Sequence, residues 1–430
     1  MTREALGFTA PAARSATAGG YRSFAARLVE GDLISDPWLD GRPRFADRPL
    51  VLPWAHHQAL VQAAERVGAV YDQVVRLCAS DEALCRRYFD FTPWQRRMWL
   101  RSAPLWHGIA RADVFFTEDG PAVCELNCDT PSGEAEAVVL GDLSRSGRGD
   151  LLDPNRDLEP RFCRLIERMA GRRFAEAAGG PLCVGIVYPT ELTEDLSMVA
   201  LYRRWIEKRG GRVVLGSPYN LAPASGGGVA LFGRRLDLVV RHYKTDWLGE
   251  RLPVRDDEPP CADAAALRGP LSLLLCPSAP PVLNPLPSIA AQNKRSMALM
   301  WEEQGRFPGW ARAVIRRHVP LTLRLEALPR ERLRRDKDRW VLKSDYGCEG
   351  AEVVVGAEST PAEWDDALGH ALPRRFVAQR HFAALRDGDG CQHNHGVFLV
   401  AGAAAGLFTR VQRGRTDRGA VTRATLVQAG

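Results

Sequence analysis

The stretch RADVFFTEDGPAVCELNCDTPSG, residues 111–133, decides the fold of this chain. Two runs rich in strand-forming residues flank Glu118-Asp119-Gly120, which is a turn signal. The stretch therefore predicts a β-hairpin. Arg111 and Asp113 alternate along its first strand, so both lie on one face.

The second strand carries polar side chains at every other position. Glu125, Asn127 and Asp129 share one face, and the opposite face, directed toward a core, takes Cys124, Leu126 and Cys128. Two carboxylates and an amide form an all-oxygen set, which suits Mg²⁺ better than zinc. A solvent-facing polar edge that needs no partner is the alternative.

A hairpin places facing residues about 5 Å apart across its two strands. Asp113, Glu125 and Asn127 are therefore expected to converge on one ion, with Arg111 nearby. No CxxC pair occurs among the ten cysteines, so neither a zinc knuckle nor a redox pair is indicated.

The totals describe an ordinary globular protein. The chain has 430 residues, of which 45% are hydrophobic and 26% charged, enough for two or three lobes with a cleft between them. Cysteines in apolar runs favour a reduced, cytoplasmic protein. We see neither the apolar core of a signal peptide nor a stretch that spans a membrane, and we expect no membrane partner.

The net charge of +6 resides in the C-terminal part of the chain. Residues 371–430 hold nine Arg and three Asp, a balance of +6, so the rest sums to zero. Such a segment suits an anionic ligand, for example a nucleotide or an acidic substrate. A basic nucleic-acid binder is a further hypothesis, but no nucleic-acid motif supports it, and we expect no nucleic-acid partner. A solvated Arg-rich face is the simplest alternative.

Periodicity predicts the remaining elements. Helices are expected at 54–80, near 159–178, at 194–210 and at 293–307. Strands are expected at 182–188, 212–218 and 374–382, with further strand structure over 395–411, and residues 338–356 are expected to form a strand, a Gly-containing turn and a second strand. Residues 259–288 are expected to be a Pro-rich linker or wrapped loop. Strand, helix and strand over 182–218 make a βαβ unit with parallel strands.

Two lysines accompany features that suit phosphate binding. Lys343 ends a strand, and Gly347 and Gly350 flank the turn that follows, so backbone N–H groups and one cation can contact a polyphosphate. A plain β-hairpin with two turn glycines explains the same residues. Lys294 starts a helix, where the helix dipole does not stabilise a cation, so a ligand contact is worth considering.

His393 and His395 lie on one strand face, and such a pair can bind a transition metal. Spacing supplies no third ligand, so two ordinary imidazoles in a half-buried strand are the simpler interpretation.

Taken together, these stretches resemble one family, the synthetase domain of glutathionylspermidine synthase and its relatives, which are circularly permuted ATP-grasp amide ligases. The first stretch resembles the family's Arg-x-Asp hairpin followed by Glu-x-Asn-x-Asp-Thr-Pro. NPLPSIAAQNKRSMALMWE (284–302) resembles its Asn-Lys helix, VLKSDYGCEGAEV (341–353) its glycine-containing loop, and GVFLVAGAAAGLFTRV (396–411) its closing strand pair. The similarity runs from about residue 90 to the end. The strand that carries Glu125 precedes Lys294 and Lys343 in the chain, whereas ordinary ATP-grasp enzymes place the nucleotide lysines before the metal carboxylates, and this order is the one expected of the permuted family.

The resemblance implies an α/β fold with α+β lobes, namely a circularly permuted ATP-grasp with a pre-ATP-grasp βαβ lobe. The expected domains are residues 1–150 with the metal-binding hairpin, 151–285 as the βαβ lobe, and 286–430 as the nucleotide-binding lobe with its lid.

The resemblance also assigns roles to residues. The implied Mg²⁺ ligands are Asp113, Glu125 and Asn127; the implied catalytic residues are Arg111 and Arg410; and the implied ATP-binding residues are Lys294, Lys343, Gly347, Gly350, Gln379 and Arg380. The segment from Gln379 to Phe382 would line the adenine slot, mostly through its backbone. Ser344 and Cys348 depart from the family pattern and suggest a differently shaped lid.

The implied activity joins a small-molecule or peptide carboxylate to an amine, with ATP and Mg²⁺ and through an acyl phosphate. A nucleotide-binding homologue that does not ligate and acts as a partner or regulator is the alternative. Candidates for the acceptor site are Tyr243, Lys244, Asp246 and Trp247, which follow a strand end, with a structural role equally open. The sequence indicates neither the substrates nor the oligomeric state.

Overall fold

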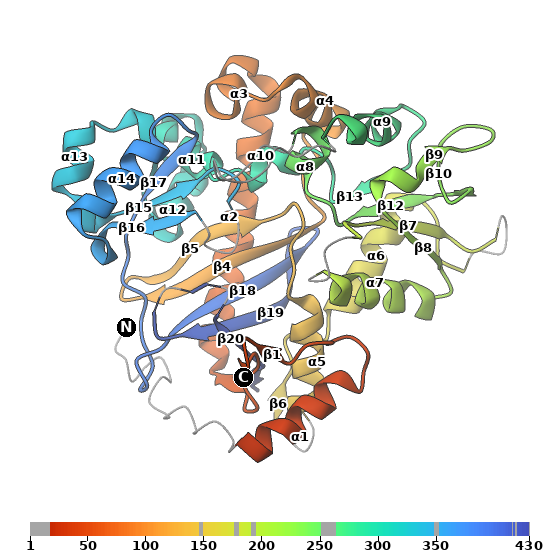
Figure 1. Ribbon diagram of the computed structural model, residues 1–430, viewed down its shortest axis with the longest axis horizontal. Coiled ribbons are helices and arrows are strands. Elements are labelled where there is room, and N and C mark those ends of the chain that lie inside the picture. Colours follow the sequence, from red (N-terminus) through yellow and green to blue (C-terminus); the bar gives the residue numbers. More distant parts are fainter. Residues whose placement is uncertain are drawn as a thin grey trace.

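The computed structural model describes residues 18–145, 149–175, 180–190, 195–250, 264–347, 352–414, 416–417 and 419–429. A five-stranded antiparallel sheet in the order β20-β19-β18-β4-β5 lies at its centre (Figure 1). Its strands are β4 (Ile109–Thr117), β5 (Gly120–Asn127), β18 (Gln392–Val400), β19 (Ala403–Gln412) and β20 (Val421–Arg423). The predicted hairpin therefore forms, and it pairs with strands from the C-terminal end of the chain.

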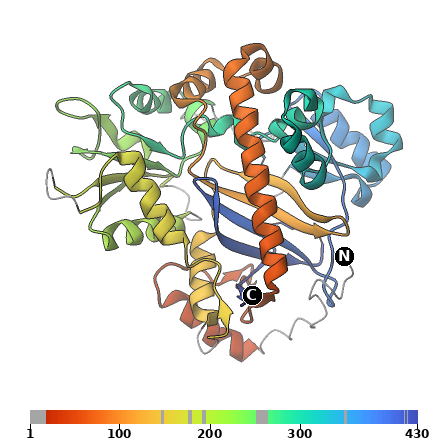
Figure 2. The ribbon, with the colours of Figure 1, turned by 180° about the vertical axis from the view of Figure 1, so that it is seen from behind.

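The predicted helix at 54–80 is confirmed as α2 (Trp54–Ser80), which crosses one face of the central sheet (Figure 2). Its apolar stripe includes Leu60, Val67 and Val74, all fully buried. They belong to the same core cluster as Val114 of β4 and Leu126 of β5. Because α2 covers this face, the polar side chains of the hairpin belong to the opposite face.

A second antiparallel sheet, in the order β14-β17-β15-β16, forms what we call the β14–β17 lobe. Its elements are β14 (Thr322–Arg324), β15 (Trp340–Ser344), β16 (Val353–Val355), β17 (Phe376–Arg380), α13 (Arg330–Arg335) and α14 (Pro361–Ala371). Trp340 and Trp364 anchor a core between this sheet and the two helices. The opposite face of the sheet carries Lys343 and Gln379.

The predicted βαβ unit is confirmed by a parallel sheet in the order β13-β12-β7-β8. Its elements are β7 (Cys183–Val187), α7 (Leu196–Lys208), β8 (Arg212–Gly216), β12 (Leu238–Arg241) and β13 (Val282–Leu283), with α6 (Leu158–Ala170) packed beside α7. Phe162 of α6 stacks on Tyr202 of α7, with their ring centroids 4.5 Å apart.

The other elements connect these layers. They are the helices α1 (Ala18–Val29), α3 (Glu82–Phe89), α4 (Pro93–Ser102), α5 (Glu134–Arg145), α8 (Thr245–Glu250), α9 (Ala264–Leu275), α10 (Ser288–Gln292), α11 (Arg295–Glu302) and α12 (Gly309–His318), the short 3₁₀ helices Pro218–Asn220, Gln304–Arg306, Leu325–Ala327, Lys337–Arg339 and Gly356–Glu358, and the strands β1 (Trp38–Leu39), β2 (Arg42–Pro43), β3 (Leu50–Leu52), β6 (Leu151–Leu152), β9 (Leu221–Pro223), β10 (Val229–Leu231), β11 (Arg234–Arg235) and β21 (Thr425–Gln428). None of the described helices is both long enough and apolar enough to cross a membrane.

Three boundaries differ from the sequence expectations. The Pro-rich segment 259–288 is not a linker throughout, because α9 buries Leu267, Leu271 and Leu274 despite its internal proline. The helix expected at 293–307 is shorter in the structure. The backbone is extended at Asn293, and α11 runs from Arg295 to Glu302. α6 ends at Ala170, since Gly171 takes a left-handed φ of 71°.

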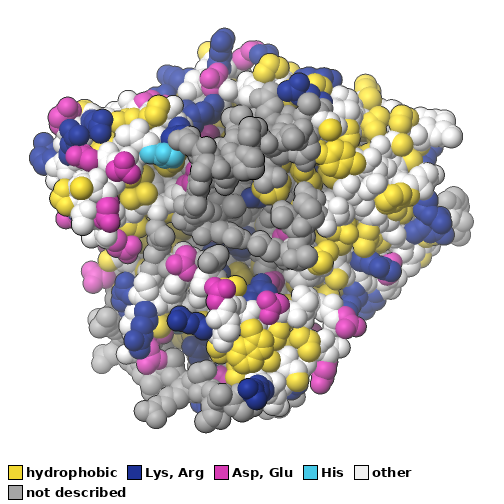
Figure 3. All heavy atoms as spheres, viewed as in Figure 1, with side chains coloured by type: hydrophobic (Ala, Val, Ile, Leu, Met, Phe, Trp, Pro, Cys, Tyr) yellow, Lys and Arg dark blue, Asp and Glu magenta, His cyan; other side chains and the backbone are white. Residues whose placement is uncertain are grey.

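The basic C-terminal segment is distributed through the fold. Arg410 and Arg375 form ion pairs with Asp113 and Asp345, and Arg423 donates to the backbone carbonyl of Arg48 at 2.9 Å. On the face in Figure 3, basic and acidic side chains are interspersed over the β14–β17 lobe. The described arginines thus include several with structural partners, which weakens the case for a nucleic-acid surface.

Candidate active site

The hairpin places four polar residues opposite one another on neighbouring strands. Asp113 of β4 is the register partner of Glu125 of β5, and Arg111 is the partner of Asn127. Cross-strand partners have Cβ atoms about 5 Å apart. The structure therefore brings together the three oxygen-bearing side chains and the arginine that the sequence singled out.

A β-bulge interrupts β5 beside this group. The register shifts between Asp113 and Val114, which leaves Cys124 without a partner on β4. Cys124 and Glu125 are both half-buried, whereas Val123 and Leu126 are buried. Strict alternation therefore fails here, and the expectation that Cys124 faces the core is wrong, because a bulge turns consecutive side chains out of the two-residue period.

Two arginines and an amide surround Asp113. Arg111 Nε donates to Asp113 Oδ1 at 2.8 Å, and Arg410 Nη2 donates to Asp113 Oδ2 at 3.0 Å. Asn394 Nδ2 donates to the same Oδ2 at 3.3 Å. Burial acts to raise the pKa of Asp113, but the two guanidinium groups outweigh it and lower the pKa below its usual range. Asp113 is therefore ionised at neutral pH, as a metal ligand must be.

Lys294 connects β5 with the segment after β15. Its Nζ lies 3.7 Å from Glu125 Oε2 and donates to the carbonyl of Gly347 at 2.6 Å. Only 5% of Lys294 is exposed. A buried ammonium group at the junction of two sheets is well placed to contact an anion that binds between them.

Lys343 and Gln379 reach the same strand from the β14–β17 lobe. Lys343 Nζ donates to the carbonyl of Cys124 at 3.3 Å, and Gln379 Nε2 donates to the same carbonyl at 3.4 Å. Both side chains come from adjacent strands, β15 and β17, in which Lys343 pairs with Val377 and Gln379 with Val341. The two sheets therefore meet at β5, beside Glu125.

Arg380 lies apart from this group. It follows Gln379 in β17, so its side chain is on the other face of the sheet, where its guanidinium stacks over Trp340 at 5.5 Å from the ring centroid. Burial and the neighbouring Arg339 lower the pKa of Arg380. The structure therefore brings Gln379 to the site but not the Arg380 side chain.

The turn after β15 is described as far as Gly347. The N–H of Gly347 donates to Ser344 Oγ at 2.9 Å, so the serine that departs from the family pattern shapes the start of the turn. A Cβ on Gly347 would overlap Ser344 Oγ and lie 3.0 Å from Glu352 Oε2. Gly350 and Cys348 lie outside the described residues.

The donor set fits Mg²⁺. No group of three or more His, Cys, Asp or Glu side chains suited to a metal occurs among the described residues, and the site offers two carboxylates with one amide instead. Mg²⁺ is usually held by one or two carboxylates together with substrate phosphates. Among the described residues, the buried Nδ2 of Asn127 has no hydrogen-bond partner, and its Oδ1 accepts a long bond of 3.4 Å from Gln292. The Asn127 amide therefore has hydrogen-bonding capacity that these residues leave unused.

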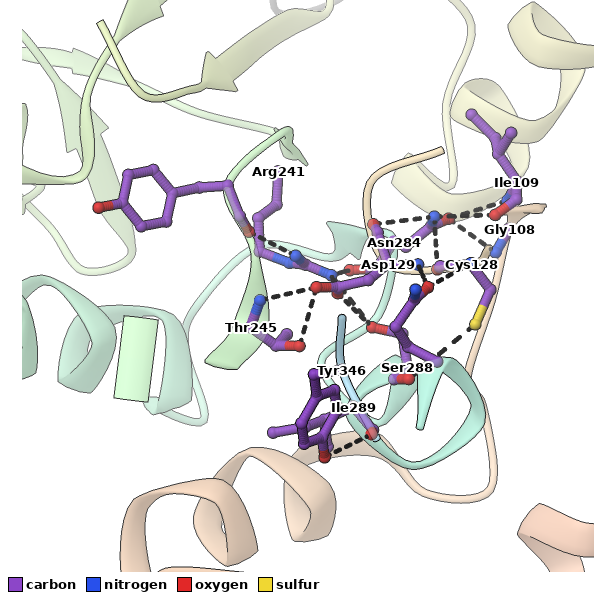
Figure 4. Close-up of polar contacts among 12 residues, drawn as sticks. Gly108, Ile109, Cys128, Asp129, Arg241, Thr245, Asn284, Ser288, Ile289 and Tyr346 are labelled. Carbon is purple, nitrogen blue, oxygen red and sulfur yellow. Dashed lines mark hydrogen bonds and ion pairs between the residues drawn. The ribbon is translucent and has the colours of Figure 1, made fainter. Parts of the chain in front are cut away.

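A buried hydrogen-bond network that the sequence did not predict lies directly after the end of β5 (Figure 4). Asp129 Oδ1 accepts from Arg241 Nη2 at 2.6 Å and from Ser288 Oγ at 2.7 Å. Asp129 Oδ2 accepts from the N–H and the hydroxyl of Thr245 at 2.8 and 3.0 Å. Asp129 therefore joins the parallel-sheet lobe to β5 through both of its carboxylate oxygens, although it continues the alternation of Glu125 and Asn127.

Asn284 completes this network. Its Oδ1 accepts from the N–H groups of Gly108 and Ile109 at 3.0 and 2.8 Å, and its Nδ2 donates to the carbonyls of Ile109 and Cys128 at 2.8 Å each. The side chain thus ties the start of β4 to the end of β5. No sequence signal marked it, because its partners lie far away along the chain.

Glu134 is a second residue that sequence reasoning missed. It is 1% exposed, and burial raises the pKa of its carboxyl to about 8. Tyr202 OH donates to Glu134 Oε1 at 3.1 Å, and Glu134 Oε2 finds no hydrogen-bond partner in the described part of the chain. The carboxyl also feels the positive charge of Arg111, so it forms part of the buried support of the site.

The two strand histidines have protein partners. His393 Nε2 lies 2.9 Å from Asp387 Oδ2, and His395 Nδ1 lies 3.2 Å from Thr409 Oγ1. Burial lowers the pKa of His395 well below its usual value. These contacts favour the interpretation of ordinary imidazoles over that of a transition-metal pair.

Comparisons with known proteins identify the family and the fold of the chain. A family model described as "Glutathionylspermidine synthase preATP-grasp" matches residues 40–425. A solved glutathione synthetase-like effector, GSS30 from Globodera pallida, has 13% sequence identity and a TM-score of 0.58, with 94% of this chain and 96% of that chain covered. A putative gamma-glutamylcysteine synthetase from Methylobacillus flagellatus KT has 12% identity and a TM-score of 0.44, covering 87% of this chain and 86% of that one. No curated protein gives a significant match.

The family model and the GSS30 structure confirm the family resemblance and the fold class stated from the sequence, an α/β ATP-grasp with a pre-ATP-grasp part. The division at residues 150 and 285 stays a prediction. The central sheet takes strands from both the first and the third of those segments.

Proposed function

The chain belongs to the glutathionylspermidine synthase pre-ATP-grasp family, and on that premise we propose that it is an ADP-forming ligase that joins a carboxylate to an amine. One observation carries the proposal: four buried or half-buried cations surround the oxygen-bearing residues of a single hairpin. They are Arg111, Arg410, Lys294 and Lys343. Such a concentration of positive charge suits a triphosphate.

In this proposal, Asp113, Glu125 and Asn127 hold Mg²⁺, which supplies charge neutralisation on the phosphates of ATP. Lys294 and Lys343 bind those phosphates from two sides, since one belongs to the segment before α11 and the other to β15. Gln379 comes from the neighbouring strand and helps to orient the nucleotide.

The reaction needs two steps. A carboxylate oxygen of the acid attacks the γ-phosphorus, the bond to the β-phosphate oxygen breaks, and ADP leaves. The amine nitrogen then attacks the acyl carbon, the bond to the phosphate oxygen breaks, inorganic phosphate leaves, and the amine loses a proton.

Arg111 and Arg410 are the residues that we assign to the transferring phosphoryl group. Both guanidinium groups are already held against Asp113 at hydrogen-bonding distance, so they are oriented before substrate arrives. Preoriented charge of this kind is the main source of catalysis in phosphoryl transfer, and loss of one such contact costs about 3 kcal/mol.

The test is ADP release by the full-length protein with Mg·ATP, a panel of carboxylic acids that includes glutathione, and a panel of amines that includes spermidine. We expect ADP release that requires one acid and one amine together, and that falls at least about a hundredfold in Arg111→Lys. Arg203→Lys, on the exposed side of α7, is the matched control.

ADP release that is equal with and without the acid and amine would contradict the ligase. Tight Mg·ATP binding without turnover on a broad panel would favour the homologue that binds nucleotide but does not ligate.

A further inference from the structure

Three hydrogen bonds attach the turn after β15 to the segment before α11. The N–H of Lys294 donates to the carbonyl of Asp345 at 2.9 Å, and the Nζ of Lys294 donates to the carbonyl of Gly347 at 2.6 Å. Asn293 Nδ2 donates to Asp345 Oδ2 at 3.1 Å. The backbone and the side chain of Lys294 are therefore held by the same short turn.

The position of Lys294 depends on an interruption of the helical backbone. Helix α10 ends at Gln292, the backbone at Asn293 is extended with a φ of −65° and a ψ of 124°, and α11 begins at Arg295. The Asn293 side chain bridges this interruption, because its Oδ1 accepts from the N–H of Arg295 at 2.8 Å while its Nδ2 donates to Asp345. The Asp345 carboxylate thus holds the Asn293 amide in the orientation that bonds to the first N–H of α11, and Lys294 lies between the two contacts.

Two further contacts hold the turn in place. Arg375 Nε lies 3.2 Å from Asp345 Oδ2, and Arg375 Nη2 donates to the carbonyl of Tyr88 in α3 at 3.1 Å. Tyr346 OH donates to the carbonyl of Ile289 in α10 at 2.9 Å (Figure 4). The Asp345 side chain is 17% exposed. Asp345 therefore lies at a junction where the β14–β17 lobe meets α3 and the segment before α11.

This junction determines where the Lys294 ammonium points. Its Nζ lies 3.7 Å from Glu125 Oε2, and the residue is 5% exposed. A lysine side chain is a flexible four-carbon stem, and an anion that binds a mobile stem must also order it. A lysine that is already oriented avoids that loss of entropy and binds the anion more tightly.

We propose that Asp345 is a positioning residue for nucleotide binding, which acts by holding Lys294 and the turn after β15 in the arrangement that receives the phosphates. The inference rests on the proposed function for the role of Lys294 as a phosphate ligand. Asp345 needs no contact with the nucleotide, because its carboxylate is already engaged by Asn293 and Arg375.

The test is a double-mutant cycle on Mg·ATP binding, measured by calorimetry with the full-length protein. The proteins are wild type, Asp345→Ala, Lys294→Met and the double variant. We expect each single substitution to weaken Mg·ATP binding by about tenfold. Because Asp345 acts through Lys294, the double variant should also lose about tenfold, whereas independent effects would multiply to about a hundredfold. The matched control is Asp365→Ala, which removes an exposed carboxylate paired with Arg334 at 2.6 Å in the same lobe and should leave the affinity unchanged.

A second ligand separates a positioning role from general loosening of the site. Adenosine lacks phosphates, so its affinity, measured by competition with ATP, should be the same in wild type and Asp345→Ala. Circular dichroism verifies that each variant is folded. If Asp345→Ala does not fold, Asn293→Ala removes the same hydrogen bond from the other side and takes its place in the cycle.

An unchanged Mg·ATP affinity in Asp345→Ala overturns the inference, and so does a loss of about a hundredfold in the double variant or an equal loss of adenosine and ATP affinity. Absence of Mg·ATP binding by wild type overturns it together with the nucleotide site. Failure of the ligase proposal alone has a different signature, in which Mg·ATP binding depends on Asp345 through Lys294 as expected but no acid and amine support ADP release.

Discussion

Replacement of Asp129 by alanine tests the buried hydrogen-bond network that holds the end of β5. The substitution removes four hydrogen-bond acceptor contacts, from Arg241, Ser288 and both donors of Thr245. It also leaves the guanidinium of Arg241, which is 0% exposed at the side chain, without its carboxylate. Breaking a buried ion pair from one side costs about 3–5 kcal/mol, and we expect a loss of this size in the free energy of unfolding.

The assay is urea unfolding, followed by both tryptophan fluorescence and circular dichroism. Glu207→Ala is the control, because Glu207 forms an exposed pair with Arg203 on α7 at 2.9 Å, and exposed pairs of this kind contribute only about 0.3–0.5 kcal/mol. The double variant Asp129→Leu/Arg241→Met should recover much of the stability lost in Asp129→Ala, since it leaves no unpaired buried charge. A loss below about 1 kcal/mol in Asp129→Ala, or a double variant less stable than the single one, would refute this reasoning.

Two further predictions concern the support of the site and the turn after β15. Glu134→Gln removes a buried carboxyl whose pKa is raised to about 8 in the folded protein. Between about pH 4.5 and pH 8 the folded wild type holds a proton that the unfolded chain releases, so the stability of the wild type falls as the pH rises. In thermal or urea unfolding, the variant should therefore gain stability relative to wild type by up to roughly 1.4 kcal/mol per pH unit over that range. A gain that does not change between pH 5 and pH 8 would disprove this assignment. Gly347→Ala forces a Cβ against Ser344 Oγ and Glu352, so we expect Mg·ATP binding in calorimetry to weaken by about tenfold. The control Gly369→Ala, where a Cβ meets open space, should bind ATP as wild type does. Equal affinities of the two variants would show that the turn does not contact the nucleotide.

The elements that local patterns determine were predictable from the sequence. The hairpin at 109–127 has a turn signal and strand-forming flanks, and α2 has an uninterrupted apolar stripe, so both follow from residues close together in the chain. The pairing of Asp113 with Glu125 was equally accessible, because a tight turn fixes the register of a hairpin.

Features that depend on distant segments were not predictable. Asp129 continues the alternation of Glu125 and Asn127, yet it turns to Arg241 because a cation from another lobe is buried against it. The bulge at Cys124 has no residue signature, and it changes which side chains share a face. Helix α9 contains Pro270, and its burial through Leu267 and Leu271 outweighs the local preference against helix.

The same distinction between local and long-range determinants applies to the residues of the candidate site. Asn284 and Glu134 act only through partners brought close by folding, so no pattern identified them. The family resemblance assigned Arg380 to the ATP site together with Gln379, but strand alternation separates their side chains onto two faces. Family similarity gave the remaining roles, and these stay predictions until a nucleotide is bound.

The most direct measurement is calorimetric titration of ATP into the full-length protein, once with Mg²⁺ and once with a chelator, for wild type and Lys343→Gln. We expect binding that depends on Mg²⁺ and that weakens by about tenfold or more when Lys343 loses its charge. Absence of ATP binding by wild type, or binding that is indifferent to both Mg²⁺ and Lys343, would contradict a nucleotide site between β5 and β15.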